Sequence, residues 1–226
     1  FPKVHLTANS QNVGFARANN QARDVMQGEW VCFLNPDTAF ETDALAGLIT
    51  WAQNQSRLGI VGPELLNPDH SHQQSVRVFP RLADQITILC KANWFLKGMP
   101  WMRRYYADLG AEQRQPIRVN QVMGAMMVLP TQVLTEVGWF DEGYPNWFEE
   151  VDLCQRVKRL GYEVWYAPVT SIIHHGNSSF GQVLTTKKHR WFLIGLRRYT
   201  WRFWPRWQAI IIQVVCVLSY GLTIIQ

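Results

Sequence analysis

The sequence predicts a chain of the α/β class, with a mostly parallel sheet flanked by helices. Its 226 residues are enough for one such domain with a sizeable core, and 47% hydrophobic with 17% charged residues is a globular composition. Short apolar runs that suit strands alternate with helix-like runs. The third observation is residues 30–38, where an apolar run leads straight into Asn35-Pro36-Asp37.

Residues 30–34 suit a strand that is covered on both faces, as in parallel sheets. Pro36 cannot donate to a strand ladder and biases Asn35 toward an extended backbone, so the strand ends there. We therefore expect Asp37 at the carboxyl end of a central strand, where open α/β sheets bind ligands. A carboxylate there suits a hard divalent cation that holds a diphosphate. The same tripeptide at residues 67–69 has polar surroundings and is interpreted as an ordinary turn.

The other elements follow from local patterns. Strands are expected at residues 1–7, at 58–61 before Gly62-Pro63, at 122–129 and at 163–173, with 73–80 extended. Helices are expected at 12–26 before Gly28, from a cap at Thr42 or Asp43 through Ala52, from Thr131 to Gly138, and from the capping-box pair Asn146 and Glu149 to Gly161.

Residues 82–109 are rich in aromatic side chains and form a helical or irregular excursion by their pattern. Two interpretations stay open for this segment. It is a packed lid, because aromatic residues mostly bury area, or it is a flap that binds an acceptor or touches a membrane.

An acidic cluster and a histidine pair carry the candidate chemistry. Glu149, Glu150 and Asp152 in a first helical turn complement the helix dipole, which explains them structurally. Alternatively their mutual repulsion raises a pKa and makes one of them a general base. His174 and His175 end a strand, so at most one faces a given site; there it is a loop residue or completes a metal shell with Asp37.

The basic charge is confined to the end of the chain. Residues 187–226 carry seven Lys or Arg and no acid, whereas residues 1–186 carry 15 bases and 17 acids. Residues 208–226 follow as an uncharged, mostly apolar run, about as long as a bilayer core requires. We expect either membrane insertion or interfacial binding, or an amphipathic helix that docks on the domain. The pattern argues against a nucleic-acid partner. The four cysteines lack metal-type spacing, and we expect them to be buried free thiols.

Together these stretches resemble the family 2 inverting glycosyltransferases of the GT-A fold, most closely the rhamnosyltransferases of bacterial surface-polysaccharide synthesis. The matching stretches are residues 12–16 with Asn19 and Asn20, 33–38, 74–80, 124–128, 137–142, 149–154 and 174–176. The resemblance implies a GT-A domain at residues 1–186, with a mixed, mostly parallel sheet. A basic-aromatic segment follows at 187–226, with an apolar membrane helix at 208–226.

The resemblance also implies roles for individual residues. Asp37, in a variant of the D-x-D motif, and His174 would hold Mn²⁺ or Mg²⁺ on the diphosphate of a nucleotide-sugar donor. Glu150 would be the catalytic base, next to Glu149 and with Asp152 supporting the helix turn. The family's usual residue at position 150 is Asp, and a shift of one bond length can cost ~10²-fold in rate. Donor or acceptor binding would involve Asn12, Gly14, Asn35, Gly124 and Asp141.

The implied reaction is the inverting transfer of a sugar, such as rhamnose, from the donor to a glycan or lipid-linked acceptor. It would take place at the cytoplasmic face of the inner (cell) membrane. One departure is that the chain begins where the family's third strand would be, so the nucleotide-binding front is expected to be missing. This leaves an alternative, a non-catalytic truncated remnant or membrane-associated interaction module.

Overall fold

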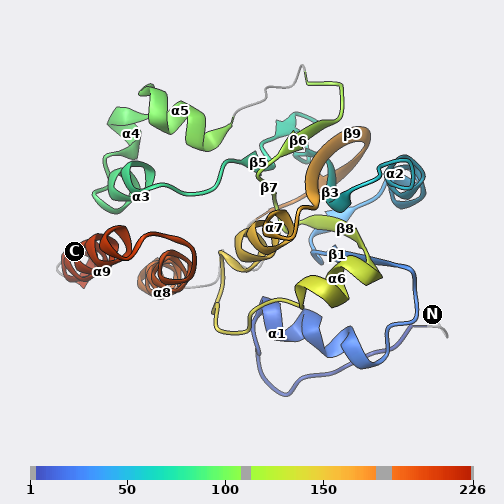
Figure 1. Ribbon diagram of the computed structural model, residues 1–226, viewed down its shortest axis with the longest axis horizontal. Helices are drawn as coiled ribbons and strands as arrows, with labels where there is room; N and C mark the ends of the chain where they lie inside the picture. The colour runs from blue at the N-terminus through green and yellow to red at the C-terminus, as the bar shows by residue number, and fades with distance from the viewer. Residues whose placement is uncertain (1–3, 108–112, 177–184, 225–226) are drawn as a thin grey trace.

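The computed structural model describes residues 4–107, 113–176 and 185–224 (Figure 1). In chain order the elements are α1 (Phe15–Asn20), the 3₁₀ helix η1 (Gln21–Asp24), β1 (Trp30–Leu34), β2 (Thr38–Ala39), α2 (Ala44–Ala52), β3 (Leu58–Leu66), β4 (His72–Gln73), β5 (Val76–Arg77), α3 (Leu82–Leu89), α4 (Asn93–Leu96), α5 (Pro100–Tyr106), β6 (Ile117–Val119), β7 (Gln121–Val122), β8 (Met126–Pro130), α6 (Thr131–Val137), α7 (Glu149–Arg159), β9 (Glu163–His174), α8 (Thr185–Phe203) and α9 (Arg206–Ile224).

A seven-stranded mixed sheet organises the fold. Its main order is β1-β8-β3-β9-β2, with β4 paired to β3 and β6 paired to β9, while β5 and β7 form a separate ribbon. The helix-flanked mixed sheet is confirmed, but the expectation of a mostly parallel one is wrong for the described residues. Only β3 and β9 pair in parallel there, and the other paired strands run antiparallel. β1 also lies at the end of this order, not at its centre.

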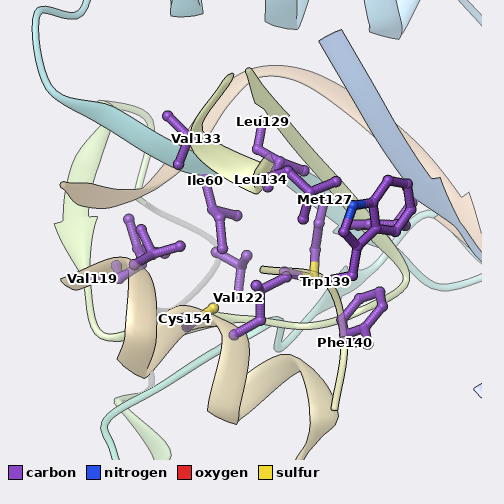
Figure 2. Close-up of a cluster of buried hydrophobic side chains, with 14 of the residues drawn as sticks. Ile60, Val119, Val122, Met127, Leu129, Val133, Leu134, Trp139, Phe140 and Cys154 are labelled. Carbon is purple, nitrogen blue, oxygen red and sulfur yellow. The ribbon is translucent and has the colours of Figure 1, made fainter. Parts of the chain in front are cut away.

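Alternate residues of the central strands serve two separate cores. On β8, Met127 and Leu129 face one cluster while Met126 and Val128 face the other, as the two-residue repeat of a strand requires. Helix α2 covers the second cluster, and α1, α6 and α7 cover the first. Figure 2 shows side chains of the first cluster converging from the sheet and from α7, around Ile60.

Several local predictions are confirmed. Asp43 caps α2, with its Oδ1 accepting from the amide of Ala46 at 3.2 Å. Helix α6 ends at Gly138, and β9 covers the expected strand and ends at His174. The helical excursion expected after residue 82 is present as α3, α4 and α5, which are joined by short turns.

Other local predictions are wrong. Residues 4–7 form no strand, and the helix expected at 12–26 is limited to α1 and the short η1. β3 continues through Gly62-Pro63, where a register shift against β9 accommodates the proline in the sheet. The strand expected at 122–129 is broken between β7 and β8 by a turn at Gly124.

A third layer lies to one side of α7, where Figure 1 shows α3, α4 and α5 beside α8 and α9. Its core includes Phe148, Leu196 and Ile212, so α8 and α9 pack on the domain. Residues 206–224 are thus helical as expected, although no helix in the described part of the chain is both long and apolar enough to cross a bilayer. The division expected at residue 186 falls in the first turn of α8 and stays a prediction.

The cysteine prediction is confirmed in part. All four thiols are free, and Cys154 and Cys216 are buried, but Cys32 is only half-buried and Cys90 is exposed. Burial raises the pKa of the Cys154 thiol to about 12, so this side chain acts as a small apolar core residue.

Candidate active site

A cavity of about 620 Å³ opens where the ends of β1, β4, β5, β7 and β9 meet the start of α7. Six of the ten site residues expected from the sequence line it: Asn35, Asp37, Gly124, Glu149, Glu150 and His174. These residues come from distant parts of the sequence, and Asp37 is more than 100 positions from both Glu149 and His174. The fold therefore brings the proposed metal ligands and the proposed base to one cavity.

Backbone hydrogen bonds hold the Asn-Pro-Asp turn at one side of this cavity. The amide of Asn35 donates to the carbonyl of Ala125 at 2.9 Å, and the Thr38 hydroxyl donates to the carbonyl of Asn35 at 2.8 Å. The amide of His175 donates to the carbonyl of Asp37 at 2.8 Å, beside the pairing of Thr38 with His174. The turn thus connects β1 to the end of β9 and places Asp37 against His174.

Asp37 and His174 form a pair that suits a divalent cation. Asp37 Oδ1 lies 3.3 Å from His174 Nε2, and both side chains are largely shielded from solvent. Among the described residues no group of three or more His, Cys, Asp or Glu gathers around a common point. One carboxylate and one imidazole fit Mg²⁺ or Mn²⁺, because such ions often take the rest of their shell from substrate phosphates and water.

A strained turn presents the two glutamates at another side of the cavity. Trp147 and Phe148 both have positive φ, 65° and 72°, in the left-handed region that bulky residues rarely adopt. Such residues cost about 1–3 kcal/mol each and are held by their surroundings. Here α8 covers the turn so closely that a Cβ on Gly195 would lie 3.0 Å from the Trp147 carbonyl oxygen.

The capping box expected from Asn146 and Glu149 is absent from this turn. Phe148 occupies the N-cap position of α7, and no side chain caps the helix there. The side chains of Glu149 and Glu150 both line the cavity, and the Glu149 carboxylate also accepts from backbone amides of this turn.

Both glutamates have environments that favour the protonated form. Glu149 is 5% exposed and its Oε2 has no hydrogen-bond partner among the described residues. Burial first, and the adjacent Glu150 carboxylate second, raise the pKa of Glu149 well above its ordinary value. Burial also raises the pKa of Glu150, while the Arg77 guanidinium and backbone amides favour its charged form. A raised pKa suits a group that must accept a proton near neutral pH.

Asp152 lies away from the cavity and serves packing. It is fully buried and accepts hydrogen bonds from the Tyr144 hydroxyl at 3.0 Å and from Arg202 at 2.9 Å, and it pairs with Arg156 one helical turn later. Because it sits two residues after Glu150, it points about 200° around the helix from it. This position fits a residue that supports the helix turn.

The remaining expected residues divide between the cavity and its surroundings. A Cβ on Gly124 would lie 3.6 Å from Cβ of Glu150, so this glycine leaves space in front of the glutamate. Asn12 instead accepts from the amide of Gly14 at 2.9 Å, just before α1. Asp141 pairs with Arg198 and Arg202 of α8. The structure therefore does not bring Asn12, Gly14 and Asp141 into the cavity lining.

Sequence reasoning missed several residues that line the same cavity, among them Phe15, Gln73, Ser75, Arg77 and Trp147. Arg77 and Ser75 fall inside a stretch that carried the family resemblance, but one sequence assigned them no role. Gln73 lies just outside that stretch and was expected only to be extended.

One family model matches most of this chain. The family model described as "Glycosyltransferase like family 2" matches residues 1–193. An N-acetylglucosaminyl-diphospho-decaprenol L-rhamnosyltransferase of Mycobacterium tuberculosis is 26% identical over 193 residues, which cover 80% of this chain and 62% of the relative. Rhamnosyltransferase WbbL of Escherichia coli is 27% identical over 203 residues, covering 87% of this chain and 70% of the relative.

A solved structure, GalNAc-T7 with UDP, GalNAc and Mn²⁺, has a TM-score of 0.49 and 15% identity over 74% of this chain and 31% of its own. Compared with the mycobacterial relative named above, the chain spans 62% of that protein's length. The family match covers most of the chain and confirms the resemblance read from its motifs. The chain belongs to the glycosyltransferase-like family 2.

Proposed function

We propose that this chain transfers a sugar from a nucleotide-diphosphate donor to a hydroxyl of a glycan or lipid-linked acceptor, with inversion at the sugar carbon. The observation that carries the proposal is that Asp37 and His174 line the same cavity as Glu149 and Glu150. Sugar transfer needs groups that hold a cation on the diphosphate at one side of the sugar, and a carboxylate that accepts the proton of the attacking hydroxyl at the other side. The proposed donor sugar is rhamnose or a close relative, supported by the names of the two bacterial relatives.

The proposed reaction is a single displacement. Glu150, in its ionised form, accepts the proton of the acceptor hydroxyl, whose oxygen then forms a bond to the anomeric carbon as the bond to the diphosphate oxygen breaks. Asp37 and His174 would hold the divalent cation, which supplies charge neutralisation for the leaving diphosphate when bound. Glu149 stays protonated, so that only one negative charge has to be accommodated at the start of α7.

The acceptor is proposed to be a lipid-linked saccharide of bacterial surface-polysaccharide synthesis. The mycobacterial relative is named for an acceptor that carries a diphosphate. In this chain Arg77 lines the cavity. Its guanidinium carbon lies over the Tyr106 ring, 5.9 Å from the ring centroid, in a cation–π contact. A guanidinium in that position suits a phosphate oxygen, because it forms directed, charge-assisted hydrogen bonds.

We expect Glu150→Gln to lower turnover by about 10²–10⁴-fold, because the amide cannot accept the proton. Donor binding should change little, since the substitution keeps the size of the side chain. The measurement is transfer of labelled rhamnose from its dTDP donor to lipid-linked acceptors, alongside calorimetric titration with dTDP and Mn²⁺. Glu142→Gln, on an exposed loop residue, is the matched control. Near-normal turnover in Glu150→Gln would exclude this residue as the base. If the parent chain itself binds no donor, the result would favour the alternative of a non-catalytic interaction module over an enzyme.

We expect Asp37→Ala to abolish the metal dependence of nucleotide binding, because the carboxylate is the anionic ligand of the proposed pair. Titration of dTDP and of UDP with and without Mn²⁺ measures this directly. Asp24→Ala removes an exposed carboxylate of η1 and should leave the metal dependence intact. Metal-dependent binding that persists in Asp37→Ala would place the cation on other residues.

We expect Glu149→Gln to stabilise the chain, and increasingly so as pH rises. The pKa of Glu149 is raised in the folded state, so above the ordinary value of 4.5 the folded chain holds a proton that the unfolded chain releases. Stability from this group is therefore full at low pH and is lost as pH rises through the folded-state pKa. Glutamine removes that loss.

Thermal unfolding across the pH range measures this effect, at about 2–4 °C for each kcal/mol in a chain of this size. Glu136→Gln, on the solvent side of α6, is the control. A difference in melting temperature between Glu149→Gln and the parent that stays constant with pH would show that Glu149 is ionised in the folded chain.

We also propose that the chain binds the cytoplasmic face of the inner (cell) membrane through α9. One face of α9 packs on the domain through Ala209, Ile212 and Cys216. The opposite face exposes an apolar stripe of Trp207, Ile210, Val214, Val217 and Leu218, each 54–65% accessible. Helices with such a stripe beside basic residues bind in the plane of a lipid interface.

The basic residues of this region are only partly free to contact lipid. Arg198 and Arg202 pair with Asp141 of the domain. Lys187, Lys188 and Arg206 have no ion pair among the described residues and support attraction to anionic lipid.

We expect the chain to sediment with vesicles that contain anionic lipid. The double substitution Ile210→Ser with Val217→Ser should weaken this binding by about tenfold or more, because each change removes an aliphatic side chain that would be buried in the lipid. Val169→Ser, an exposed valine on β9, is the control. Equal sedimentation of the parent and the double variant would rule out the α9 stripe as the contact.

A further inference from the structure

A series of hydrogen bonds connects the second Asn-Pro-Asp turn, at residues 67–69, to the proposed metal pair of Asp37 and His174. Gln73 lies between them, on β4. Its Nε2 donates to Asn67 Oδ1 at 2.9 Å and to the carbonyl of His174 at 3.1 Å, so both amide hydrogens are committed. Its Oε1 then faces His174 Nδ1 at 2.7 Å and can only accept. Nδ1 must therefore carry the hydrogen.

The orientation of Asn67 is fixed in turn by its own neighbours. Its Nδ2 donates to Ser71 Oγ at 2.9 Å, which leaves Oδ1 as the acceptor toward Gln73. Ser71 Oγ donates to Asp69 Oδ1 at 2.6 Å. Hydrogen bonds from Ser71 lower the pKa of Asp69, so this carboxylate is ionised and acts only as an acceptor. Because Asp69 can only accept, the donor and acceptor of each following hydrogen bond, up to His174, are fixed in turn.

The result is a defined tautomer at the far end of the chain of bonds. A neutral His174 that donates from Nδ1 has its lone pair on Nε2, the atom that lies 3.3 Å from Asp37 Oδ1. A lone pair facing a carboxylate oxygen repels it, and a cation between the two atoms would turn that repulsion into coordination. The opposite tautomer would instead donate to Asp37 and close the pair against a cation.

We propose that Gln73, oriented by the Asn67–Ser71 turn, is a positioning residue that keeps Nε2 of His174 available to a divalent cation. This inference rests on the proposed function, since it assigns the support of the same metal pair. The turn that contains residues 67–69, interpreted from the sequence as an ordinary turn, then contributes Asn67 and Asp69 to this support. Partners of this kind typically change metal affinity by about 10–100-fold when they are removed.

Two variants of Gln73 separate this role from simple tethering of β4 to β9. Gln73→Glu keeps an oxygen that accepts from Nδ1 but loses both donated hydrogen bonds. Gln73→Leu keeps the approximate size and loses the acceptor. Asn67→Ala leaves Gln73 in place and frees its amide to rotate, which provides a second test if Gln73→Leu folds poorly.

The experiment is long-range ¹H–¹⁵N NMR of the metal-free chain, well above the ordinary pKa of imidazole, with His174→Gln to assign the signal. The parent and Gln73→Glu should show the hydrogen on Nδ1, whereas Gln73→Leu should show it moving toward Nε2. Titration with Mn²⁺ and UDP should show affinity about 10–100-fold weaker in Gln73→Leu, a near-parent value in Gln73→Glu, and an intermediate loss in Asn67→Ala.

The outcomes distinguish this inference from the proposed function. An unchanged tautomer in Gln73→Leu overturns the positioning role, and so does an equal loss of affinity in Gln73→Glu and Gln73→Leu, because that pattern is expected of a tether. A parent chain that binds no Mn²⁺ overturns the metal pair itself, while the NMR signal still reports whether Gln73 sets the tautomer.

Discussion

The ionic contact of buried Asp152 holds together the parts of the structure on which the candidate site depends. Its carboxylate is fully buried and pairs with Arg156 of the same helix and Arg202 of α8. Arg156 also donates to the carbonyls of Val137, Gly138 and Trp139. One buried charge thus connects α6, α7, α8 and the loop between them. Removing one partner of such a pair typically costs about 3–5 kcal/mol, since the other charge is left uncompensated.

This contact also explains how α7 can begin after two strained aromatic residues and with a buried Glu149 beside a half-buried Glu150. The helix lacks a side-chain cap, and its first turn holds acids that repel each other. The interactions on its opposite face and the cover from α8 fix the helix despite these costs. Segment 185–224, whose composition suggested either a membrane element or a helix docked on the domain, is therefore part of what holds the glutamates in place.

The sequence predicted the elements that depend on local chemistry and failed where partners are distant. Asp43 at an N-cap and Gly138 at a C-terminus act on neighbouring residues, and both predictions are confirmed. Strand direction depends on which strands pair. Strand–helix alternation suggested a parallel sheet, but β1 pairs with β8, nearly 100 residues later and antiparallel. The break at Gly124 was also hidden, because the residues on both sides are apolar.

The candidate site shows the same division between local and distant information. Acids and histidines stand out in a sequence because few side chains share their chemistry, so Asp37, Glu150 and His174 could be named as candidates, while their individual roles came from the family resemblance. Gln73 and Asn67 are common polar residues, and only their partners in space give them a direction. The two Asn-Pro-Asp copies make this concrete: in one the carboxylate faces the cavity, and in the other it accepts from Ser71 on the surface.

The supports of the two halves of the cavity are separate. Asp37 and His174 are positioned by β1, β9 and the hydrogen bonds that pass through Gln73, all within the sheet layer. Glu149 and Glu150 are positioned by α7, the Asp152 contacts and α8, within the helical layer. Substitutions in one support therefore affect one half first. Under the proposed function, substitutions in the sheet layer would thus change how the donor diphosphate is held without moving the proposed base, and substitutions in the helical layer would do the reverse.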